Sequence, residues 1–175
     1  MMSSGVRKAA LISHVVCAAG WLGAVATFLA LALVGLVGTD AERARAAYLA
    51  MDSVTWLAIV PLCFASLVTG LVQALGTTWG VFRHYWVVVK LLLTLVATIG
   101  LLIHTQPIAE LAAAALHHTW AAAELQSTHL QLVVDAGAAL VVLITATAFS
   151  VIKPRGLTRH GRRKEREERA AAAAT

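Results

Sequence analysis

Apolar residues along the chain gather into four long runs separated by shorter polar stretches. A helix needs about 20 mostly apolar residues to cross the hydrocarbon core of a bilayer. The four runs meet that length and cover residues 9–37, 54–75, 86–104 and 130–152. This pattern predicts an all-α fold, a four-transmembrane-helix bundle of residues 1–156, and a basic tail of residues 157–175.

The connections between the runs differ in length and character. Residues 76–85 form a short loop, so spans two and three are expected to be antiparallel neighbours. Residues 107–128 are rich in Ala, with Ile108, Leu111 and Leu116 spaced among polar residues. Such a segment is typical of a short helix lying at the membrane surface, and we expect an outer interfacial helix there. Pro61 is expected to kink span two.

Composition and charge placement favour a membrane partner over nucleic acid. Only 13% of residues are charged, whereas a soluble domain has about 25%. Eight of the fourteen Lys and Arg residues lie between Lys153 and Arg169, after the last span. Basic residues placed after the last span are typical of a membrane protein and do not form a nucleic-acid-binding surface. The expected partner is therefore the lipid bilayer, and a second copy of the chain or another membrane protein is a further candidate partner.

The same residues predict the orientation of the chain. With the N-terminus inside, the cytoplasmic flanks hold Arg7, Lys8, Arg83 and the eight Lys and Arg residues from Lys153 to Arg169. The outer flanks hold only Arg43 and Arg45. Positive charge is retained on the cytoplasmic side of membrane proteins. We therefore expect both termini to be cytoplasmic.

Four ionisable residues interrupt the apolar runs: His14, Lys90, His104 and Asp135. A charged residue at the centre of a span costs about 2.5–3.5 kcal/mol on insertion, so each is a candidate functional residue. By residue count, His14 and Lys90 lie at similar depth near the inner side, and His104 and Asp135 lie near the outer side. The spacing thus predicts an inner pair and an outer pair.

The outer pair has a specific geometric expectation. A carboxylate inside a span must find a hydrogen-bond donor or become protonated. We expect Asp135 to point into the bundle and reach His104 or a neighbouring polar group. His104 and Asp135 are the candidate metal ligands. A simpler interpretation leaves His104 as an interfacial residue and lets Lys90 extend its ammonium to the inner headgroups.

Three motifs carry a resemblance to known families. These are His14 followed by Trp21 and Gly23, the run from His84 through Lys90 to Leu93, and Lys153-Pro154. Together they resemble an uncharacterised family of bacterial predicted integral membrane proteins, which implies the plasma membrane of a bacterium. More distantly, the arrangement of four spans with these motifs resembles the four-helix bacterial protoporphyrinogen oxidase and the membrane part of CopD-like proteins. The resemblance to the oxidase implies haem b, with His14, Trp21 and Lys90 as cofactor-binding residues.

Three functional hypotheses follow. The first is a small membrane protein that binds haem b or a metal within the bundle. The second is a non-enzymatic accessory or assembly subunit of a membrane complex. The third is a proton- or ion-coupled small transporter, with Asp135, His104 and Lys90 marking a polar route.

Overall fold

The computed structural model describes residues 2–76, 81–117, 122–152 and 156–173. The elements in chain order are α1 (Ser4–Val37), α2 (Ala41–Val54), the π-helical turn η1 (Thr55–Ile59), α3 (Val60–Gly76), α4 (Tyr85–Ile103), α5 (Thr105–His117), α6 (Ala122–Ile152) and α7 (Arg159–Ala173). Four helical stretches are long and apolar enough to cross a membrane: Ser4–Val37, Ala41–Gly76, Tyr85–Leu116 and Ser127–Ile152. The predicted all-α class with four apolar helices is confirmed, and the chain fits a polytopic membrane protein.

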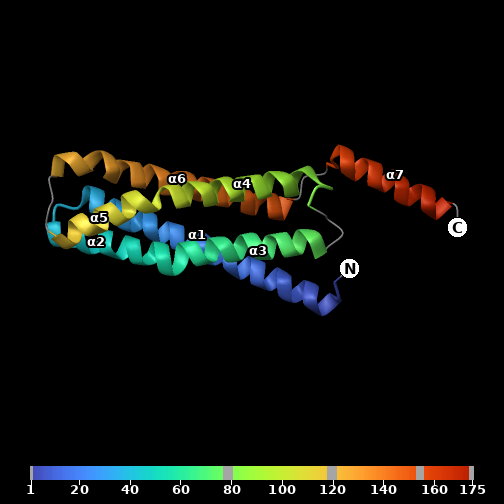
Figure 1. The fold of residues 1–175 in the computed structure, drawn as a ribbon, viewed down its shortest axis with the longest axis horizontal. Helices are drawn as coiled ribbons and strands as arrows, with labels where there is room; N and C mark the ends of the chain where they lie inside the picture. The colour runs from blue at the N-terminus through green and yellow to red at the C-terminus, as the bar shows by residue number, and fades with distance from the viewer. Residues whose placement is uncertain (1, 77–80, 118–121, 153–155, 174–175) are drawn as a thin grey trace.

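The four long stretches lie side by side, and both chain termini lie at the same end of the bundle (Figure 1). We call this the terminal end, where α3 ends and α4 begins, and the opposite end the distal end. α1 packs against α2, α3 and α6, and α4 packs against α3 and α6. This arrangement brings polar residues of α1, α3 and α4 together toward the terminal end, and joins the end of α4 to α6 toward the distal end.

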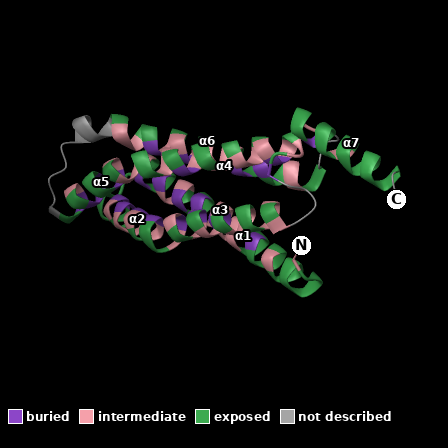
Figure 2. Cartoon of the chain, turned by 45° about the vertical axis from the view of Figure 1, so that its right-hand side comes forward, coloured by how far each residue is buried: buried purple, intermediate pink, exposed green. Residues whose placement is uncertain are grey.

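The surface of the bundle is apolar, as a lipid environment requires. Figure 2 colours the ribbon by burial, and exposed residues occur along every helix of the bundle. Large exposed side chains include Leu57, Val96 and Val141, whereas Trp21 and Phe28 lie in the interior cluster. Lipid tails are as apolar as these exposed side chains, so their exposure to lipid carries no hydrophobic penalty.

The helical stretch Ala41–Gly76 is irregular just before Pro61, where a kink was expected. Proline has no backbone N–H, so the helical ladder is interrupted on its N-terminal side. The structure has the π-helical turn η1 directly before this point, with the Val60 N–H bonded to the Thr55 carbonyl. The Thr55 hydroxyl donates to the Met51 carbonyl at 2.8 Å, which satisfies a buried polar group there.

The expected outer interfacial helix is not confirmed. Residues 105–117 form α5, but Ile108, Leu111 and Ala115 are buried in the core. α5 packs against α2, and the Arg45 Nε donates to the Ala115 carbonyl at 2.7 Å. These three apolar residues therefore pack inside the same chain, whereas Leu116 is exposed.

Candidate functional site

The imidazole of His14 on α1 packs against small residues of α3. Only 8% of the residue is exposed. Its Nδ1 lies 3.1 Å from the Ser66 carbonyl oxygen and 3.1 Å from the Thr69 Oγ1. A carbonyl oxygen only accepts hydrogen bonds, so Nδ1 carries the proton. The Thr69 hydroxyl gives its own proton to the Ala65 carbonyl at 2.6 Å and accepts from His14.

Small residues of α3 make this seat possible. A Cβ added at Gly70 would lie 3.0 Å from the His14 Cε1, closer than side chains normally approach. Ser66 is buried one turn away on the same helix. Small residues four positions apart, such as Ser66 and Gly70, commonly let transmembrane helices pack closely; here they make room for the imidazole of His14.

The second ring nitrogen of His14 faces Lys90 on α4. The Lys90 Nζ lies 3.2 Å from the His14 Nε2. Because Nδ1 carries a proton, the neutral ring presents a lone pair at Nε2, and the Lys90 ammonium donates to it. The residues predicted to form an inner pair therefore meet at the terminal end, and one proton lies between their two nitrogens.

His104 and Asp135 meet toward the distal end. The His104 Nε2 lies 2.9 Å from the Asp135 Oδ2, and the side chains are 27% and 33% exposed. This contact joins the end of α4 to α6 and confirms the expected position of Asp135 beside His104. On the other side of the ring, the His104 Nδ1 lies 2.7 Å from the Gly100 carbonyl oxygen.

The protonation of this pair decides whether both contacts of His104 can be hydrogen bonds. The Gly100 carbonyl accepts only, so Nδ1 is protonated. Among the residues that the structure describes, the Asp135 Oδ2 makes no hydrogen bond, so its 2.9 Å contact with Nε2 is a close approach of two polar atoms. A hydrogen bond here would need a further proton, on the imidazole or on the carboxyl. Without that proton, either the carboxylate faces a lone pair at Nε2 or the carbonyl faces one at Nδ1. Both contacts would be hydrogen bonds together only with a proton held by the His104–Asp135 pair.

Polar residues also lie on α4 between the two pairs. The Thr94 hydroxyl donates to the Lys90 carbonyl and the Thr98 hydroxyl donates to the Thr94 carbonyl, each at 2.8 Å. Thr98 is buried, and its Oγ1 lies 3.1 Å from the Sγ of Cys63 on α3. Since the Thr98 proton is already donated, the Cys63 thiol is the donor in that contact. Lys90 and His104 are 14 residues apart, which corresponds to about 21 Å along the helix.

Trp21 lies in the core, two turns along α1 from His14, and is 3% exposed. In the part of the chain that the structure describes, its Nε1 has no hydrogen-bond partner. A buried indole N–H without an acceptor costs free energy and is uncommon in native proteins. This N–H is thus available to a bound water or to a polar group of a ligand.

The fit of haem b to these residues is partial. His14 offers one nitrogen, and its Nδ1–H bond to a carbonyl resembles the outer-shell bond of metal-ligating histidines. Lys90 occupies the direction in which Nε2 would bind iron. His104 lies near the other end of the membrane part and does not complete an axial pair with His14.

The outer pair supplies two metal-ligating side chains. Among the side chains that the structure describes, which leave out those of residues 117–126, no group of three His, Cys, Asp or Glu is able to hold a metal ion. Structural metal sites usually have four ligands. His118 and the motif Lys153-Pro154 lie outside the described residues.

Comparison of the chain with protein families, with curated proteins and with solved structures finds no match.

Proposed function

We propose that this chain is a proton-coupled membrane transport protein, in which the His104–Asp135 pair is the proton-binding site. The observation that carries this proposal is the position of His104 between two acceptors, the Gly100 carbonyl at 2.7 Å and the Asp135 carboxyl at 2.9 Å. A proton bound by this pair would let the close contact between Nε2 and Asp135 become a hydrogen bond, and its release would leave two acceptors facing each other. Proton binding is thereby coupled to the packing of α4 against α6.

The inner pair gives the proposal a second proton-holding group at the other end of α4. Lys90 and His14 share one proton between Nζ and Nε2. Ionisable residues inside transmembrane bundles commonly mark proton relays. Thr94 and Thr98, which lie on the same helix between the pairs, add polar groups along the route.

The test uses purified protein in liposomes that contain a pH-sensitive dye. An imposed membrane potential should drive proton movement with the wild-type protein. Asp135→Asn should abolish it without loss of folding, because the amide N–H donates to Nε2 and carries no exchangeable acid proton. Gln131→Ala, one turn away on the same helix, is the control and should retain the flux. Equal flux in wild type and Asp135→Asn would refute the proposal.

A second function, haem b binding at His14, is favoured by two specific observations. The Nδ1–H of His14 is fixed by the Ser66 carbonyl, and the Trp21 N–H is buried with no acceptor among the described residues. Bound haem would supply electron-transfer or redox chemistry. Lys90→Met would free Nε2, so on this hypothesis it should raise haem binding, measured by the Soret absorbance. No Soret band in wild type or Lys90→Met after haem supplementation would end this candidate.

A further inference from the structure

The C-terminal helix α7 is fixed to the bundle at the terminal end by main-chain contacts. The Thr158 N–H donates to the Arg83 carbonyl at 3.0 Å, and the Tyr85 N–H donates to the Gly156 carbonyl at 3.3 Å. The Thr158 hydroxyl also donates to the Phe82 carbonyl. These contacts join the segment before α7 to the segment that leads into α4.

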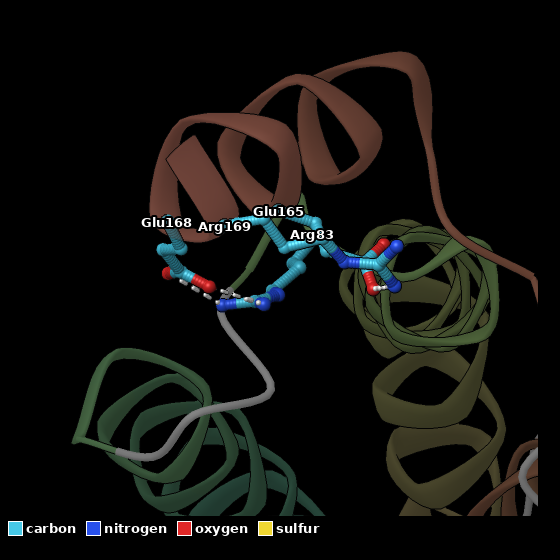
Figure 3. Close-up of polar contacts among 4 residues, drawn as sticks. All are labelled: Arg83, Glu165, Glu168 and Arg169. Atoms are coloured by element: carbon cyan, nitrogen blue, oxygen red, sulfur yellow. Dashed lines mark hydrogen bonds and ion pairs between the residues drawn. The ribbon is translucent and has the colours of Figure 1, made fainter. Parts of the chain in front are cut away.

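A side-chain ion pair strengthens this attachment. The Arg83 guanidinium donates to both oxygens of Glu168, at 3.2 and 3.0 Å (Figure 3). A bidentate pair fixes orientation as well as distance. α7 is therefore held in a defined position, projecting from the terminal end (Figure 1).

The junction leaves an open pocket of about 540 Å³. Phe82, Tyr85 and Val88 form one part of its lining, and Thr158, Arg159 and His160 form the other. Phe82 is 63% exposed and Tyr85 is 52% exposed, so the apolar part is open to the surroundings. The pocket therefore joins an apolar wall at the start of a span to a cationic rim outside it.

The apolar wall continues along α4. Tyr85, Val88, Leu92, Val96 and Ile99 recur at the three- and four-residue spacing that keeps side chains on one face of a helix. Leu92, Val96 and Ile99 are all exposed. This stripe is a track on which an acyl chain can lie from the pocket into the membrane.

The charge at the rim is not neutralised by the acidic residues of α7. This helix has three glutamates, and each is engaged by another arginine: Glu168 by Arg83, Glu167 by Arg163 and Glu165 by Arg169. Arg159 therefore presents its positive charge to the pocket. A ligand that matches both parts has a negative headgroup and a long apolar chain.

We propose that this pocket binds one anionic phospholipid from the leaflet at the terminal end of the bundle. The phosphate is held by Arg159, and an acyl chain lies on the stripe that begins at Tyr85. The bound lipid would connect the α7 junction to the membrane.

The test is native mass spectrometry of the full chain in detergent, titrated with phosphatidylglycerol or phosphatidylcholine. One phosphatidylglycerol should bind in preference to phosphatidylcholine. Arg159→Gln should weaken that binding about fivefold, as expected for one cation near a lipid headgroup. Arg166→Gln removes the same charge from the same helix outside the pocket, and should change the affinity less than about twofold.

Three results would overturn the proposal. One is equal binding of the two lipids, and another is an equal loss in Arg159→Gln and Arg166→Gln, which would indicate attraction by total charge. The third is displacement of phosphatidylglycerol by an equal concentration of glycerol phosphate, since a ligand without acyl chains makes no use of the wall. Phe82→Ser provides a second variant and should weaken phosphatidylglycerol binding while leaving the Arg83–Glu168 attachment in place.

Discussion

Lys90 donates a hydrogen bond to the Nε2 of His14 at 3.2 Å, across 76 residues of sequence. This contact explains how two ionisable side chains are accommodated inside a bundle. The ammonium finds an acceptor, and the imidazole has both of its nitrogens satisfied. Removing either residue leaves the other with an unmatched polar group, which is costly where water is scarce.

Replacement of Lys90 tests the strength of this contact. Lys90→Met keeps the length of the side chain but strands the His14 Nε2, and should lower the free energy of unfolding by about 1–3 kcal/mol. The measurement is unfolding by titration with a denaturing detergent. Lys8→Met, at an exposed position of α1, should have little effect. Equal stability of Lys90→Met and wild type would show that the contact contributes nothing.

Gly70 tests the seat of the imidazole. A Cβ at this position would press on the ring of His14, and overpacking of this kind costs about 1–3 kcal/mol. Gly70→Ala should therefore lower stability in the same unfolding titration. Gly23→Ala is the matched control, because a Cβ there meets nothing within 4 Å. A Gly70→Ala protein as stable as Gly23→Ala would contradict the described position of His14.

Gly161 tests the attachment of α7. A Cβ at Gly161 would collide with the backbone carbonyl of Arg83, although alanine is the better helix former. Gly161→Ala should thus release an intact helix, and trypsin should cut it several-fold faster. Gly5→Ala, where a Cβ has open space, is the control. Arg83→Gln should give a smaller effect, since exposed ion pairs contribute about 0–1 kcal/mol. Unchanged cleavage in Gly161→Ala would refute the attachment.

The orientation of the chain is tested by reporter fusions. The charge distribution predicts that Gly38 faces outside and that residues after Ile152 are cytoplasmic. Alkaline phosphatase should therefore be active when fused after Gly38 and inactive when fused after Ile152. Activity of the fusion after Ile152 would contradict the predicted orientation.

The apolar pattern was sufficient to predict the membrane part of the fold. The requirement for about 20 apolar residues per span is a simple physical constraint, and α4 begins and ends within one residue of the predicted third span. Depth along the helices was likewise enough to pair His104 with Asp135, because a carboxylate in a span needs a partner at its own height.

Contacts between distant segments were not accessible in this way. α5 was expected at the membrane surface because its apolar residues suit an interface. In the structure, several of these residues pack against α2 and join the core instead. The basic tail has a polar composition that gives no sign of docking. Its attachment depends on main-chain contacts of Thr158 and on the pairing of Glu168 with Arg83. The contact of the Gly100 carbonyl with the His104 Nδ1 was also not predicted, because every residue has a backbone carbonyl and the sequence does not show which one accepts.

The central claim is that one proton is shared between His104 and Asp135, and infrared difference spectroscopy tests it most directly. Membranes containing the protein are titrated with acid and base while the carboxyl and imidazole bands are recorded. Wild type should lose one proton from this pair, with the carboxyl and His104 signals changing together. Asp135→Asn should remove both changes and still fold. A His104 signal that titrates unchanged in Asp135→Asn would show that the two residues hold no common proton, and would contradict the account.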